Sequence, residues 1–97
     1  MATFITLLRW TQKGIENVRE SPNRLDSARS VFRELGGEMK SFHLVMGRYD
    51  AVIVTEAPSA DVVAKALLSI CSKGNAQTET LQAFTENEFR KIISALP

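Results

Sequence analysis

The order of strand-like and helix-like segments constrains the fold of this sequence more than any other feature. Runs rich in β-branched and aromatic residues, typical of strands, cover residues 2–10, 38–46, 51–56 and about 76–84. Apolar residues at helical spacing fill the two longer intervals, one between the first and second runs and one between the third and fourth. The chain is therefore expected to run strand, helix, strand, strand, helix, strand, followed by one more helix.

Capping residues mark where these helices begin and end. In Ser21-Pro22 the serine is expected to cap the first helix and the proline to take its first position, and Gly36-Gly37 is expected to stop it. The second helix is expected to open at Pro58-Ser59 and to close at Lys73-Gly74. Thr85-Glu86-Asn87-Glu88 has the pattern of a capping box ahead of apolar residues at helical spacing, which predicts the third helix.

The short connection between the second and third strands fixes their pairing. Gly47-Arg48-Tyr49-Asp50 is too short for a crossover, so these strands form an antiparallel hairpin. With right-handed crossovers elsewhere, the order predicts an α+β fold of the ferredoxin-like split β-α-β type. Its four-stranded antiparallel sheet would have the strand order 4-1-3-2, with two helices on one face. A polar loop over residues 11–21 would hang over the end of the first strand.

The first strand carries apolar residues on both of its faces. Phe4 and Leu8 alternate with Ile5 and Leu7, so one of the two sets cannot be covered by the two crossover helices. We therefore expect two copies to pair sheet to sheet in the manner of a dimeric α/β-barrel, with the C-terminal helix near the joint. The expected partner is thus the chain itself, as a homodimer or a higher homo-oligomer.

Length and composition place the chain among ordinary globular proteins. With 97 residues it is expected to form a single domain over residues 1–97. A net charge of +1 is unlike the basic balance of nucleic-acid binders, and no membrane span or leader pattern is seen, so no nucleic-acid or membrane partner is expected. Cys71 is the sole cysteine and lies on an apolar helical stripe, which predicts a shielded thiol and a cytoplasmic location.

Four segments resemble the GYD domain family, which takes its name from the hairpin turn. They are Trp10-Thr-Gln-Lys-Gly-Ile15, Asn17-Val18 through Ser21-Pro-Asn-Arg24, Met46-Gly-Arg-Tyr-Asp50 with the strand that follows, and Gly74-Asn-Ala76 with the strand that follows, so the resemblance runs essentially the whole length. It implies a ferredoxin-like fold of the dimeric α/β-barrel kind, found in small bacterial or archaeal proteins. It supplies no catalytic residue, and His43 stands where family members more often have an aromatic residue.

A candidate ligand site follows from the expected topology. The exit of the first strand and the hairpin turn share one end of the sheet, which would bring together Trp10, Lys13, Tyr49 and Asp50. His43 joins them only if its side chain points toward the helices. An aromatic wall, a cation, a phenol and a carboxylate suit a small aromatic or carboxylate-bearing ligand. No metal site and no cofactor are expected, because paired metal-ligand spacing and phosphate-binding loops are missing.

Three functions stay open on the sequence. The first is a small-molecule-binding or ligand-responsive homo-oligomer, and the second is a cofactor-independent isomerase or monooxygenase in which His43 or Tyr49 moves a proton. The third is a protein-interaction module. The same residues also have purely structural interpretations: Trp10 as packing at a strand end, His43 as a hydrogen-bonded sheet residue, and Tyr49 and Asp50 as turn residues.

Overall fold

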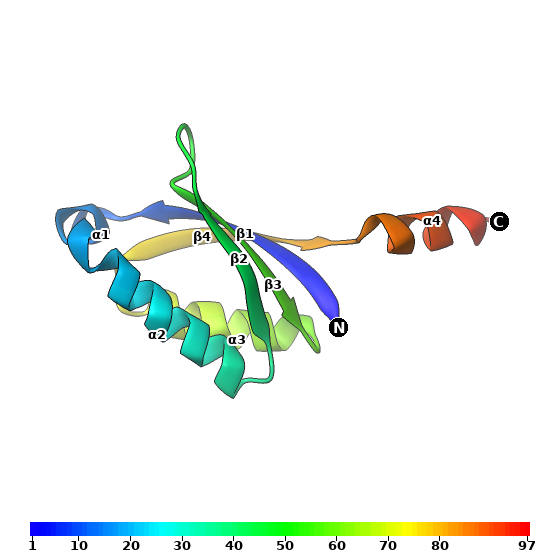
Figure 1. The fold of residues 1–97 in the computed structure, drawn as a ribbon, viewed down its shortest axis with the longest axis horizontal. Coiled ribbons are helices and arrows are strands. Elements are labelled where there is room, and N and C mark those ends of the chain that lie inside the picture. Colours follow the sequence, from blue (N-terminus) through cyan, green and yellow to red (C-terminus); the bar gives the residue numbers. More distant parts are fainter.

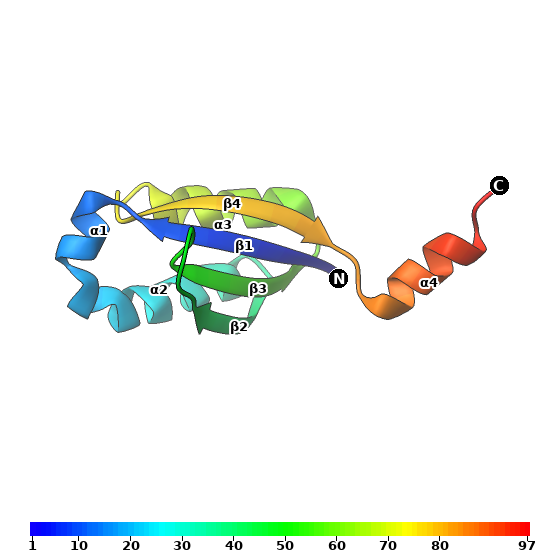
Figure 2. The same ribbon diagram turned by 90° about the horizontal axis from the view of Figure 1, so that it is seen from above.

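The computed structural model describes residues 1–97 and confirms the expected order of elements. The strands are β1 (Ala2–Trp10), β2 (Glu38–Leu44), β3 (Ala51–Ala57) and β4 (Ala76–Ala83), and the helices are α1 (Gln12–Glu16), η1 (Val18–Glu20), α2 (Ser21–Glu34), α3 (Ala60–Cys71) and α4 (Glu86–Ser94). The sheet order is β2-β3-β1-β4 with every neighbouring pair antiparallel, which is the predicted 4-1-3-2 order. Helices α2 and α3 cover one face and leave the other open (Figures 1 and 2).

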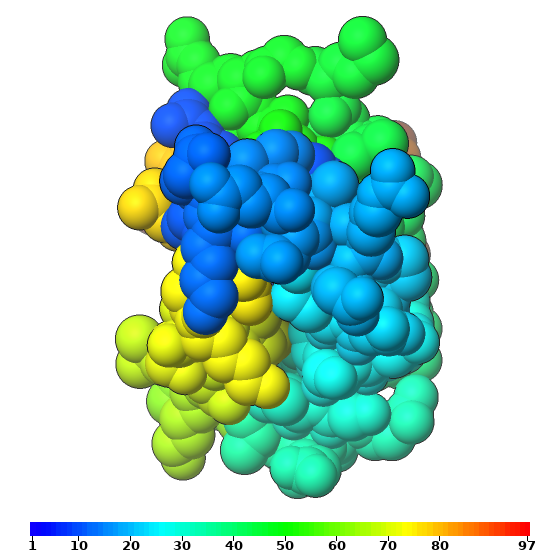
Figure 3. Space-filling model, turned by 90° about the vertical axis from the view of Figure 1, so that its left-hand side faces the viewer, coloured from blue at the N-terminus to red at the C-terminus, as the bar shows by residue number.

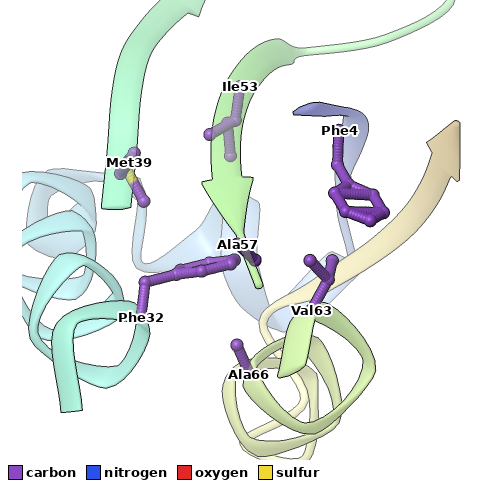
Figure 4. Close-up of a cluster of buried hydrophobic side chains, with 7 residues drawn as sticks. All are labelled: Phe4, Phe32, Met39, Ile53, Ala57, Val63 and Ala66. Atoms are coloured by element: carbon purple, nitrogen blue, oxygen red, sulfur yellow. The ribbon is translucent and has the colours of Figure 1, made fainter. Parts of the chain in front are cut away.

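The core lies between the sheet and these two helices. Even-numbered residues of β1 face the helices, because side chains alternate along a strand, and Phe4 is 3% exposed. Register places the odd-numbered residues of β3 on the same face, including Ile53. Figure 4 shows these side chains meeting Phe32 of α2 and Val63 and Ala66 of α3. The opposite parity, including Ile5 and Leu7, lies on the open face.

The polar stretch after β1 is more ordered than predicted. In place of a loop, the structure has the short helices α1 and η1. The Thr11 side chain caps α1 by accepting a hydrogen bond from the Gly14 amide at 3.1 Å. Ser21 is not the cap of α2, because η1 runs straight into that helix and Ser21 is its first residue. The capping box at Thr85 and Glu88 is present as predicted.

A β-bulge in β2 changes which side chains face the helices. Met39 pairs with Thr55 and Ser41 pairs with Val54, so Lys40 between them has no partner across the strands. Met39 therefore faces the helices before the bulge, and Phe42 faces them after it. This shift moves the odd-numbered residues beyond the bulge to the open face.

Helix α4 projects away from the rest of the molecule (Figures 1 and 2). The molecule measures 51 × 31 × 17 Å, and its radius of gyration is 14.6 Å. A compact chain of this length has a radius of gyration of about 12.5 Å. The excess reflects an arm that packs on nothing within its own chain.

Candidate functional site

Asp50 ties the exit of β1 to the hairpin turn. Its Oδ2 accepts a hydrogen bond from the Trp10 amide at 2.9 Å, and its own amide donates to the Leu8 carbonyl at 2.8 Å. The turn reverses at Gly47, whose φ of 125° is a conformation that residues with a side chain rarely adopt. The sequence prediction that β1 and this turn share one end of the sheet is therefore confirmed. The Asp50 carboxylate has a structural role there.

A cavity of about 230 Å³ lies between the sheet and helices α2 and α3. Trp10 is even-numbered like Phe4, and its side chain lines the cavity. The apolar wall continues with Phe32, Phe42, Leu67 and Ile70. Figure 3 looks onto this end of the molecule, where α1 (blue) lies above the line along which the end of α3 and the turn after it (yellow) meet α2 (cyan).

Polar side chains at this end fasten the short helices over the cavity. Arg24 of α2 donates to the carbonyls of Asn17 at 2.9 Å and Gly14 at 3.2 Å. The Lys13 Nζ donates to the Lys73 carbonyl at 2.7 Å, near the end of α3. The Lys13 ammonium is thus bound to a backbone carbonyl, and Lys13 is not among the residues that line the cavity, whereas Lys73 is.

Tyr49 lies on the other face of the sheet from the Trp10 ring. Its hydroxyl donates to Glu79 Oε2 at 2.6 Å, and Glu79 pairs with Leu7, whose side chain faces the open side. Arg9, also on that side, places its guanidinium carbon 4.9 Å from the Tyr49 ring centroid. The hydrogen bond to Glu79 is the main cause that raises the pKa of Tyr49 above 10.0.

His43 also lies on the open face. It pairs with Val52, and side chains directly opposite each other across two strands share a face. His43 is exposed. The structure therefore divides the predicted residues: Trp10 lines the cavity, Lys13 and Asp50 fasten the end of the sheet, and Tyr49 and His43 lie on the open face.

Sequence reasoning missed three residues at this end of the molecule. Arg9 and Glu79 complete the cluster around Tyr49, and Arg24 holds the short helices in place. The parity of β1 could have placed Arg9 opposite Trp10. The partnership of Glu79 depends on the register between β1 and β4, which the sequence does not fix.

Neither a metal-binding cluster nor a membrane-spanning helix is found in the structure. No three His, Cys, Asp or Glu side chains gather where they could bind a metal ion. No helix has both the length and the apolar character needed to cross a membrane. The predicted site residues thus divide between the cavity, the end of the sheet and the open face.

The sheet order, crossover helices and hairpin turn define a small ferredoxin-like α+β domain. The family model of the GYD domain matches residues 4–93, and the chain belongs to this family, as its turn predicted. The chain is similar to the glutamine synthetase and cystathionine beta-lyase binding protein of Thermus thermophilus. The two are 37% identical over 84 residues, which cover 86% of this chain and 88% of that protein.

Two solved structures are also similar. A feast or famine regulatory protein from M. tuberculosis, complexed with L-methionine, has a TM-score of 0.67 and 16% identity, covering 88% of this chain and 51% of that chain. This chain therefore corresponds to about half of that regulator, and at such identity the likeness shows the fold alone. A crystal structure of a Thermus thermophilus protein has a TM-score of 0.52 and 28% identity, covering 88% of this chain and 95% of that chain.

Proposed function

We propose that this protein is a homo-oligomeric binding domain that associates with metabolic enzymes. The observation that carries the proposal is an imbalance of apolar surface. Twelve large hydrophobic residues are exposed, whereas only eight hydrophobic residues are buried, and three of these eight are alanines. Exposed apolar surface on this scale is typical of chains that bury it against other proteins.

The exposed apolar side chains are not scattered. One group lies on the open face, where Leu81 is 52% exposed next to the half-buried Ile5 of β1. A second group lies on α4, and a third lies at the hairpin, where Met46 is 97% exposed. Several separate surfaces allow the domain to bind its own copies and a different protein at the same time.

The Thermus relative supports enzymes as the class of partner. Its name states that it binds glutamine synthetase and cystathionine beta-lyase. The identity of 37% extends over most of both chains, which supports a similar kind of partner for this chain. Glutamine synthetase from the same organism as this chain is the first candidate, and the expected cytoplasmic location is part of the proposal.

A test needs purified components, because capture from a lysate would not identify a direct partner. The chain would be mixed at micromolar concentration with purified glutamine synthetase and, separately, with cystathionine beta-lyase from its own organism. Sedimentation velocity is expected to show the small chain moving with at least one of these enzymes, and not with an unrelated protein of similar size. Free sedimentation of the chain in both mixtures would reject the proposal.

The cavity favours a second candidate function, a response to a small ligand. Trp10, Phe32 and Phe42 supply an aromatic wall. Two basic residues, Arg24 and Lys73, line the cavity against one acidic residue, Glu20, so an aromatic carboxylate such as phenylacetate suits the space. Because Trp10 is the sole tryptophan, its fluorescence reports directly on the cavity. Phenylacetate is expected to change the emission of the natural chain and of a Ser30→Phe control. An Ala28→Phe variant, which fills the cavity, should not respond.

The enzymatic alternative gains no support from the geometry. His43 and Tyr49 lie on the open face, whereas the cavity opens on the helix side of the sheet. A ligand held against Trp10 would be separated from both side chains by the backbone of β1 and β3. Proton transfer by these residues would require a ligand bound on the open face.

A further inference from the structure

Helix α4 carries an apolar stripe that its own chain does not cover. Phe89 and Ile93, four residues apart, lie beside Ile92 and Leu96 on one side of the helix, and all four are 44–61% exposed. Arg90 and Lys91 occupy other faces, and Glu86 lies at the edge of the stripe, seven residues before Ile93. An isolated helix of this length is marginal in water, so an ordered α4 needs a surface on which to bury the stripe.

A groove lined by apolar residues runs between α3 and β4 at the edge of the sheet. Its floor includes Phe4, Val63 and Leu67, and its side is formed by residues spaced four apart on α3: Ala60, Ala64 and Leu68. Both alanines are exposed, and Leu68 is 72% exposed. The two alanines in this row let a second helix approach α3 closely. The row itself, with residues four apart, forms a ridge of the kind that packs into the groove of another helix in 4-4 packing.

We infer that α4 of one copy occupies the α3–β4 groove of a second copy, which returns its own α4 in the same way. This rests on the self-association in the proposed function, but it uses a surface separate from the open face. The groove is long enough for the helix, since α4 spans about 13.5 Å and α3, which forms one side of the groove, spans about 18 Å. The contact is reciprocal, as a two-fold pair requires, because each chain carries one helix and one groove.

The chain's own groove is the competing place for α4. Only Phe84 and Thr85 separate β4 from α4, so a return onto the same chain would need a reversal within these two residues. Thr85 is extended instead, with φ −67° and ψ 166°, and is fixed by its capping box with Glu88. The helix is thereby directed outward, away from the rest of its own chain, as Figure 2 shows.

Cysteine cross-linking between differently tagged copies tests the contact. In a Cys71→Ser background, a chain with Ala64→Cys is mixed with a tagged chain carrying Ile93→Cys and oxidised. A disulfide-linked heterodimer is expected. The matched control is Ser94→Cys, on the opposite side of α4, which should yield much less. Equal yields from the two positions, or no heterodimer with Ile93→Cys, would overturn the inference.

Sedimentation equilibrium separates failure of this inference from failure of self-association. Ile93→Asp on α4 and Ala64→Arg in the groove are each expected to weaken association by roughly 100-fold. Neither side chain is part of the buried core, so both variants should keep the native circular dichroism spectrum. A monomeric natural chain would reject self-association altogether. An oligomer unaffected by both substitutions would reject only the α4 contact.

Discussion

Gly14 is the position near the cavity where one added methyl group is expected to destabilise the protein most. It lies in α1, is buried, and faces the turn between α3 and β4. A Cβ atom built at this position would lie 2.0 Å from the Asn75 carbonyl oxygen and 2.9 Å from its carbonyl carbon. Both atoms belong to the backbone, so no side-chain rotation relieves the overlap. Gly14→Ala must therefore push α1 away from residues 74–75.

The cost follows from what holds α1 in place. The Thr11 amide donates to the Asn75 carbonyl at 3.1 Å, and the Thr11 hydroxyl donates to the Gly74 carbonyl at 2.6 Å. Losing both bonds costs about 1–3 kcal/mol, and overpacking adds a similar amount if α1 cannot move freely. Replacing glycine by alanine within a helix returns about 1 kcal/mol. The expected net loss is about 1–5 kcal/mol, and each 1 kcal/mol lowers the melting temperature by roughly 4–8 °C.

Urea unfolding followed by Trp10 fluorescence measures this loss, and hydrogen exchange locates it. Gln12→Ala is the matched control, because Gln12 is an exposed residue of the same helix whose hydrogen bond to Glu16 lies in solvent. The control should change the unfolding free energy by less than about 0.5 kcal/mol. If Gly14→Ala is as stable as the natural chain, or more stable, the close approach of α1 to Asn75 is wrong.

Three further predictions concern single side chains. Tyr49, the sole tyrosine, should ionise with a midpoint above pH 10.0 in a titration followed at 295 nm, and Glu79→Gln should lower that midpoint. The stability that the hydrogen bond from Tyr49 to Glu79 gives is present below pH 10 and is lost as the pH rises through the raised pKa of Tyr49. Cys71, half-buried in the α3–β4 groove, should react with a thiol reagent more slowly in the natural chain than in Ile93→Asp. Asp50→Ala should lower the unfolding free energy by about 1.5–3 kcal/mol, as measured by urea unfolding, with Asp50→Asn costing less.

The fold was predictable because several local signals agree with one another. The capping box at Thr85 and the stop at Gly36-Gly37 set the helix limits, and the short connection around Gly47 set the hairpin, although β2 ends at Leu44, two residues before the predicted end. Right-handed crossovers then leave few sheet orders open. The direction of α4 was not predictable in this way. Its apolar residues have the same spacing as those of a helix that packs on its own core, and the surface that α4 contacts belongs to another molecule.

The bulge at Lys40 explains why the facing of β2 could not be predicted. Apolar residues occur at both parities there, Met39 on one and Phe42 on the other, and a regular strand would send one of them to the open face. The extra residue lets both contact the core. Nothing in Lys40 itself marks a bulge, since its position depends on how β2 pairs with β3. The face of the sheet on which His43 lies therefore follows only from the register between β2 and β3.

The two sides of β1 also decide how the candidate site must be interpreted. Residues 9 and 10 are neighbours in the chain, yet a period of two places Arg9 on the open face and the Trp10 ring against the helices. No small ligand can touch the Trp10 ring and the Tyr49 hydroxyl together, because the sheet lies between them. A ligand that uses the aromatic wall belongs to the cavity. The cluster of Arg9, Tyr49 and Glu79 belongs instead to the face that pairing of two sheets would cover, where a fixed charge pattern sets the register between copies.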